Sequence, residues 1–137
     1  MRSKKVEAYL VHTEPAKAQD NPRVLRILLL PHATQIDFGY VAPWIYKRGG
    51  WIRIAPHTHI KCHGANQKFH LLDSKNIPIA PKHHHFESVQ DWMMFSLWFE
   101  ALPATATHID IIEEEFPSAD DFNFYNISLQ PRIPLIM

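Results

Sequence analysis

The segment Met93–Glu100, MMFSLWFE, indicates the fold class most clearly, because its large apolar residues recur at every second position. In an extended chain, successive side chains point to opposite faces of a sheet. One face of this segment then carries the odd-numbered residues Met93, Phe95, Leu97 and Phe99. The pattern predicts a β-strand that buries the odd-numbered face and turns the even-numbered face outward.

Further short apolar runs lie on both sides of this segment, and turn residues or prolines separate them at intervals of about ten residues. The other candidate strands are Val6–Leu10, Arg23–Leu30, Thr34–Phe38, Trp51–Ile54, Ile60–Cys62, Lys68–Leu72, Ile77–Ile79, His108–Ile112 and Phe122–Leu129. No long stretch carries the apolar stripe of an amphipathic helix. The sequence therefore predicts an all-β fold, an antiparallel β-sandwich of about eight or nine strands, immunoglobulin-like or jelly-roll-like.

The last candidate strand predicts strict alternation, with Phe124 and Asn126 on one face and Tyr125 and Ile127 on the other. Beyond it, Pro131 and Pro134 make the tail a poor central strand, since proline cannot donate to a sheet ladder. We therefore expect a core over about residues 6–130, with loose termini.

Length and composition indicate one globular domain over residues 1–137, with 46% hydrophobic and 20% charged residues. The 14 basic residues balance the 14 acidic ones, which gives a formal net charge of zero. Such a chain lacks the basic surface that binds duplex nucleic acid or an anionic membrane. The single cysteine, Cys62, excludes an intramolecular disulfide framework.

The N-terminal residues Arg2, Lys4 and Lys5 resemble the basic start of a signal peptide, but no apolar region follows them. The longest apolar run, residues 27–31, is far shorter than the ~20 residues of a membrane-spanning helix. The sequence predicts a soluble cytoplasmic chain without a membrane segment. An exported chain from which a leader had been removed would look the same.

Four segments together resemble a small β-sandwich module of Bacteroidetes proteins. They are WIRI at 51–54, FSLWFEALP at 95–103, IDIIE at 109–113 and FNFYNISL at 122–129. This module commonly precedes exported thioredoxin-like and other cell-envelope proteins, and its own function is unassigned. The resemblance covers about residues 20–130. It implies an immunoglobulin-like sandwich with an interaction role, and it transfers no site residues.

The histidines of GGWIRIAPHTHIKCHG (residues 49–64) are the best candidates for chemistry. On a continuous strand, His57, His59 and His63 would share a face, where imidazoles can bind zinc, iron, copper or nickel. The segment also partly resembles the first cupin motif through Gly50, His57 and His59, with His63 at the position of the expected glutamate. The simpler interpretation is a polar, exposed strand face, so the sequence favours no cofactor and keeps a divalent transition metal as the alternative.

Aromatic residues gather around a proline and a Gly-Gly turn, and Tyr40, Trp44 and Tyr46 are the candidates for contact with a ligand or partner. Exposed aromatic rings can stack on sugars or form a protein contact.

Sequence signatures of nucleophilic catalysis, phosphate binding and dinucleotide binding are absent from the chain. The sequence therefore favours a non-enzymatic binding or interaction module, with a protein partner or self-association. Two alternatives stay open. One is a cupin-like metal-binding protein or metal-dependent enzyme that uses the histidine strand, and the other is carbohydrate binding through the aromatic loop.

Overall fold

A computed structural model describes residues 6–11, 23–41, 51–52, 54–77, 84–85, 92–113 and 123–136. These residues form strands and no helix, which confirms the all-β class. The strands are β1 (Val6–Val11), β2 (Arg23–Leu29), β3 (Thr34–Val41), β4 (Trp51–Ile52), β5 (His59–Cys62), β6 (Lys68–Lys75), β7 (His84–His85), β8 (Trp92–Phe99), β9 (His108–Ile112), β10 (Phe124–Ser128) and β11 (Arg132–Ile136). Within the described ranges no helix is long and apolar enough to span a bilayer.

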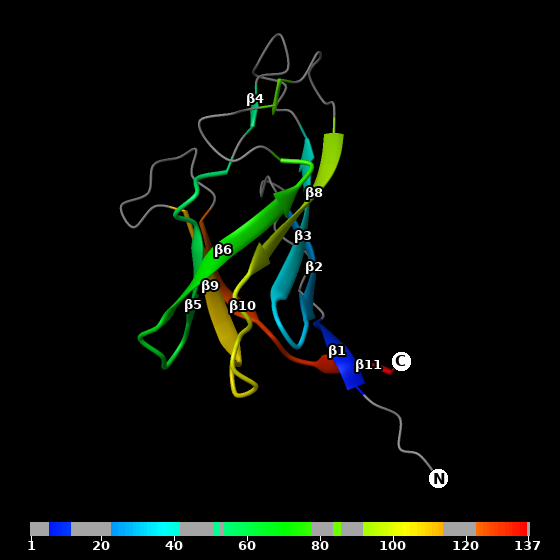
Figure 1. The fold of residues 1–137 in the computed structure, drawn as a ribbon, viewed down its shortest axis with the longest axis vertical. Helices are drawn as coiled ribbons and strands as arrows, with labels where there is room; N and C mark the ends of the chain where they lie inside the picture. The colour runs from blue at the N-terminus through cyan, green and yellow to red at the C-terminus, as the bar shows by residue number, and fades with distance from the viewer. Residues whose placement is uncertain are drawn as a thin grey trace.

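Nine of these strands form one antiparallel sheet in the order β10-β9-β5-β6-β8-β3-β2-β1-β11, and β4 pairs with β7 in a separate ribbon. The sheet curls like half of a barrel (Figure 1). The curl brings the Phe38 ring of β3 to 5.7 Å from the Phe124 ring of β10, although four strands lie between β3 and β10 in the sheet order. One curled sheet therefore encloses the core, and the predicted stacking of two separate sheets stays a prediction.

Strand β6 joins the two halves of the curled sheet, and it crosses Figure 1 diagonally. Its first residues pair with β5, where Phe69 lies opposite Ile60. Its later residues pair with β8, and the register shifts between Leu71 and Asp73. A bulge of this kind bends the strand and increases its twist. The bulge at Leu72 therefore lies where the sheet turns from one half to the other.

The predicted faces of the segment 93–100 are confirmed in β8. Phe95 and Leu97, on the inner face, are 1% exposed. Met94, on the opposite face, is 51% exposed. The core side chains come from both halves of the sheet. The largest of them are Phe38, Phe95, Phe99, Ile27, Ile36, Ile54, Ile60, Leu97, Ile109, Ile111 and Leu129.

The predicted alternation of the last segment is wrong, because β10 is bulged. Its register against β9 shifts between Phe124 and Ile127, and Asn126 has a φ of 56°. Asparagine adopts this left-handed conformation more readily than most residues. As a result, Phe124 and Ile127 both pack against the core, although strict alternation would put them on opposite faces.

The C-terminal residues that we expected to be loose form the strand β11, which pairs with β1. Among the described strands, β11 has no second neighbour, so it is an edge of the sheet. Pro134 lies opposite Tyr9 in this pairing. An edge is where a sheet tolerates proline, so the prediction that this tail makes a poor central strand agrees with its position.

Candidate functional site

The three candidate metal-ligand histidines lie at the two ends of the short strand β5. His57 is exposed in the turn before the strand, and His59 begins the strand and is 4% exposed. The Nδ1 atom of His59 lies 3.0 Å from the carbonyl oxygen of His57. His63 follows the strand, and its side chain is 44% exposed.

The structure does not bring these three imidazoles into one ligand set. The predicted common face requires an extended chain from residue 57 to residue 63, but turns lie on both sides of β5. Among the residues that the structure describes, no three His, Cys, Asp or Glu side chains are arranged to hold a metal ion. The metal site at His57, His59 and His63 stays a prediction.

Metal content measures this prediction directly. We expect untagged protein, purified without nickel resin, to carry well under one equivalent of zinc, iron, copper or nickel. The reason is that no three candidate ligands among the described residues are arranged around one ion, and that His57 is exposed whereas His59 is buried. Inductively coupled plasma mass spectrometry of wild type and His57→Ala makes the comparison. About one equivalent that disappears in the variant would instead support the predicted metal site at His57, His59 and His63.

His63 takes part in a different polar contact. Its Nε2 atom lies 2.9 Å from Oδ1 of Asp110 on β9, and the same oxygen accepts a 2.7 Å hydrogen bond from the backbone N–H of Asn126. Burial raises the pKa of Asp110, but the Asn126 and His63 hydrogen bonds and the nearby Lys61 outweigh it, so this pKa lies below its ordinary value. Asp110 thus stays ionised and holds the bulge of β10 against β9.

Cys62, the single cysteine of the sequence, ends β5. Its side chain is 4% exposed and packs in the core, and burial raises the pKa of the thiol. A buried thiol with a raised pKa is a poor nucleophile.

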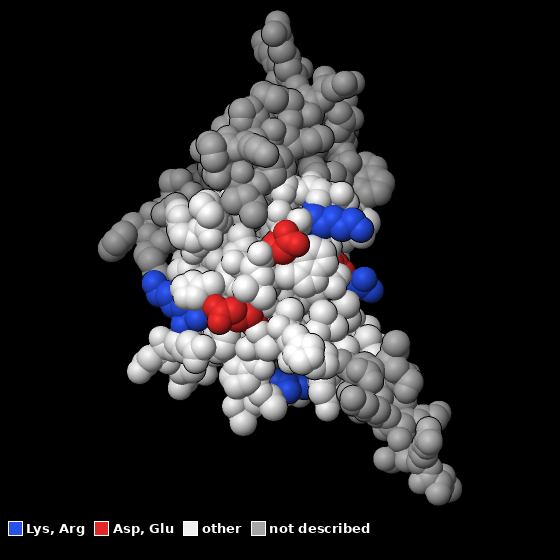
Figure 2. All heavy atoms as spheres, in the orientation of Figure 1, with Lys and Arg blue, Asp and Glu red and all other residues white. Residues whose placement is uncertain are grey.

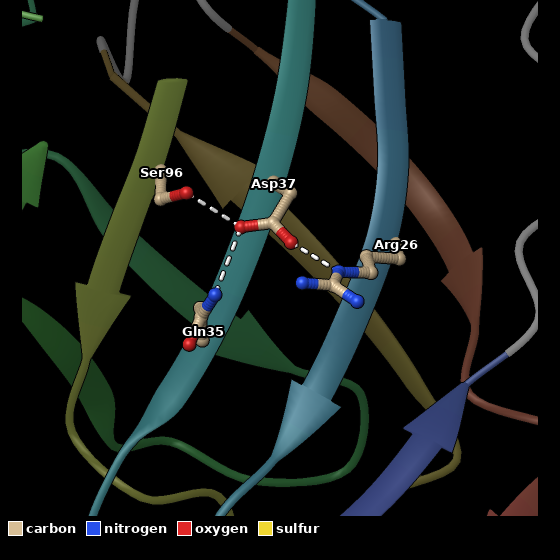
Figure 3. Close-up of polar contacts among 4 residues, drawn as sticks. All are labelled: Arg26, Gln35, Asp37 and Ser96. Carbon is tan, nitrogen blue, oxygen red and sulfur yellow. Dashed lines mark hydrogen bonds and ion pairs between the residues drawn. The ribbon is translucent and has the colours of Figure 1, made fainter. Parts of the chain in front are cut away.

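The sequence analysis missed a polar constellation centred on Asp37 of β3, which is buried (Figure 3). Ser96 Oγ donates to Asp37 Oδ1 over 2.6 Å and Gln35 Nε2 donates to the same oxygen over 3.0 Å. Arg26 Nε donates to Asp37 Oδ2 and forms an ion pair with it. Arg26, Asp37 and Ser96 are register partners on the neighbouring strands β2, β3 and β8.

This arrangement keeps Asp37 ionised. Burial raises its pKa, but the hydrogen bonds from Arg26, Gln35 and Ser96 and the charge of Arg26 together lower it below the ordinary value. A general base at neutral pH needs a raised pKa, so Asp37 acts as a structural link between three strands. The only local signal is the pair Gln35 and Asp37, two residues apart. Arg26 and Ser96 are too distant in the sequence for any motif to reveal them.

The outer face of the sheet carries exposed apolar side chains around this polar link. Met94 lies opposite Gly39 in the sheet register, and a Cβ at position 39 would lie 3.4 Å from Leu25 Cδ1. Leu25 thus covers Gly39 and is itself 42% exposed. Leu72, in the β6 bulge, is 56% exposed. We call Leu25, Leu72 and Met94 the outer apolar face.

The candidate aromatic contact is only partly covered by the structure. Trp44 and Tyr46 lie outside the described residues. The backbone of Tyr40 belongs to β3 and pairs with Met93, but its side chain is not among those described. Contact through these three residues stays a prediction.

The described residues thus include the outer apolar face and a set of polar contacts that stabilise strands. Within those residues the carboxylates with shifted pKa values, Asp37 and Asp110, are both held ionised. Neither arrangement resembles a pair of groups that shares a proton in catalysis. No protein-family model, curated protein or solved structure matches this chain.

Proposed function

We propose that this chain is a non-enzymatic interaction module and that its outer apolar face binds protein, with a second copy of the chain as the partner. The observation that carries the proposal is the exposure of Leu25, Leu72 and Met94, at 42%, 56% and 51%. Leu25 and Met94 both lie beside Gly39, and Leu72 lies in the bulge near the other end of β8. Large exposed apolar side chains that gather on a face are typical of interaction surfaces.

The polar link beneath this face suits an interface. Asp37 is 5% exposed and its charge is met by Arg26 and two further donors. A partner that covers Asp37 therefore meets a carboxylate that is already paired, and burying an unpaired one would be costly. The Arg26 side chain is 55% exposed and brings an exposed cation to the same face. Arginine is enriched at protein interfaces.

Charge supports a second copy as the partner. The chain has 14 basic and 14 acidic residues, so two copies do not repel each other through net charge at pH 7. Figure 2 shows few charged side chains of both signs on one face of the described part, with no patch of a single sign. A net charge near zero promotes association.

The resemblance to the Bacteroidetes β-sandwich module points to the same role. We also propose that the fold is an immunoglobulin-like or jelly-roll-like sandwich. The soluble cytoplasmic location is part of the proposal as well. The metal-dependent and carbohydrate-binding alternatives make different predictions, since they depend on His57, His59 and His63 or on Tyr40, Trp44 and Tyr46.

Sedimentation velocity across a concentration series tests the proposal. We expect wild type to associate reversibly in the micromolar range. The variant Met94→Lys should weaken this association at least about tenfold, because burying an unpaired ammonium costs more than ~1.4 kcal/mol. The control is Tyr125→Lys, which adds the same charge at an exposed aromatic on β10.

One result of this experiment supports the proposal, and two results overturn it. Association that weakens in Met94→Lys and persists in Tyr125→Lys supports the proposal. A wild-type chain that stays monomeric at several hundred micromolar overturns it. Association that Met94→Lys leaves unchanged also overturns it, since the outer apolar face would then not be the contact. Circular dichroism of each variant confirms that it is folded.

A further inference from the structure

A pocket of about 280 Å³ lies at one end of the sheet and shares no lining residue with the outer apolar face. Residues of β1, the end of β2 and the segment after β8 line it, together with the first residue of β11. Its apolar wall includes Leu29, Pro31, Ala101 and Leu102. The volume is close to the lower limit for small-molecule sites, about 300 Å³.

The wall of this pocket holds one cation, Arg132, and no carboxylate among its described lining residues. Nη1 of Arg132 donates to the carbonyl oxygen of Ala104 over 2.7 Å, and Nη2 donates to the carbonyl oxygen of Ala106. Both acceptors are neutral backbone groups. The charge of Arg132 is therefore held in place without an anionic partner among the described residues.

The segment that holds Arg132 is itself ordered by a turn. The backbone N–H of Ala106 donates to the carbonyl oxygen of Pro103 over 3.0 Å, and both Ala104 and Ala106 face Arg132 with their carbonyls. Two of the five guanidinium N–H groups are engaged in these bonds, and Nε is buried without a partner. One N–H on each of Nη1 and Nη2 has no partner among the described residues. Arginine N–H groups form strong hydrogen bonds with carboxylates.

We propose that this pocket binds a small amphipathic carboxylate, with its carboxylate on Arg132 and its hydrocarbon part against Leu29 and Leu102. Charge selects the anion because the wall offers a cation and no carboxylate. The apolar wall selects a ligand with a hydrocarbon part, since that surface leaves water on binding. The small volume favours a short chain over a long one.

Hexanoate is the probe for this site, and hexanol and hexylamine are the controls for its charge. We expect hexanoate to bind with a millimolar or lower Kd in titrations followed by backbone amide NMR, with shifts grouped around Ala101 and Arg132. Hexanol should bind at least about tenfold more weakly, because a hydrogen bond to a charged group is stronger than one to a neutral group. Hexylamine should not bind there.

Two variants separate the roles of charge and space. Arg132→Met should weaken hexanoate at least about tenfold, and Arg23→Met is its matched control because Arg23 is exposed at the opposite end of β2. Arg132 also holds two carbonyls, so Arg132→Met could lose stability. Ala101→Leu fills the pocket and keeps Arg132, and it should abolish binding in a folded protein.

Three results would overturn the inference. They are the absence of hexanoate shifts at 20 mM ligand (about twenty times a 1 mM Kd), equal affinity for hexanoate and hexylamine, and unchanged binding in Ala101→Leu. Because the pocket and the outer apolar face share no residue, self-association in Met94→Lys and hexanoate binding in Ala101→Leu fail or succeed independently.

Discussion

Phe38→Ala should lower the free energy of unfolding by about 3–5 kcal/mol, the range for a buried phenylalanine. Phe38 is 1% exposed. Its ring stacks on Phe95 of β8, with centroids 4.9 Å apart, and it contacts Phe124 of β10 at 5.7 Å. The substitution therefore removes a contact within one half of the sheet and a contact between its two halves. Urea denaturation followed by circular dichroism measures the change.

Tyr125→Ala is the matched control, because it removes an aromatic ring that is 58% exposed on β10. We expect its effect to stay below about 1 kcal/mol, as for most exposed positions. A loss below ~1 kcal/mol in Phe38→Ala would contradict the packing described for the curled sheet. Domains of this size are stable by only about 5–15 kcal/mol, so the expected loss is a large fraction of the total.

Asp37→Ala should cost about 2–4 kcal/mol, because hydrogen bonds to a charged group contribute ~1.5–3 kcal/mol each and are not additive. The variant removes the acceptor for Ser96 and Gln35 and the partner of Arg26. Arg26 is 55% exposed and can turn to water, so the loss comes mainly from the donors on β3 and β8. Ser96→Ala is the control, since it removes one donor and should cost less.

Acid should reproduce part of this loss in the wild type. The pKa of Asp37 is lowered in the folded protein, so its contribution to stability is complete above the ordinary value of 3.8. As the pH falls below 3.8 and through the lower folded value, folding opposes protonation and the contribution disappears. The difference in stability between wild type and Asp37→Ala should therefore shrink as the pH falls below 3.8.

Arg26→Met tests what keeps that pKa low. Burial alone raises the pKa of Asp37, and Arg26 supplies both a hydrogen bond and a positive charge against it. In the variant, the folded pKa of Asp37 should rise toward or above the ordinary value of 3.8, so the stability lost as the pH falls below 3.8 should be smaller than in wild type. Urea melts between about pH 3 and pH 6, a range that brackets the ordinary value of 3.8, measure this change. An unchanged acid profile would show that Gln35 and Ser96 suffice.

Period-two alternation predicts part of the fold well. It identifies β8 and the correct buried face, because eight consecutive residues there stay in register with β3. It fails where an extra residue enters a strand. The bulges at Leu25, at Leu72 and before Ile127 each change which side chains face the core. A bulge depends on the neighbouring strand, so a single sequence does not reveal it.

The candidate sites also differ in how far apart in the sequence their residues lie. The histidine pattern at residues 57–63 is local, but its geometry depends on a strand that spans only His59–Cys62. The Asp37 link depends on partners that the topology brings together, Arg26 and Ser96, which are 11 and 59 residues away. Hydrophobic patterning does not reveal the contacts of Asp37 with Arg26 and Ser96, because these contacts lie on the outer face of the sheet.

The pairing of β1 with β11 has a consequence for how the chain is made. Val11 and its partner Arg132 are synthesised roughly 6–24 s apart at the usual 5–20 residues per second. During that interval β2 is the only described neighbour of β1, and the other edge of β1 stays open. An open strand edge is a template for pairing with another chain. Nascent copies on one messenger are therefore most prone to join wrongly just before residues 132–136 leave the ribosome and close that edge.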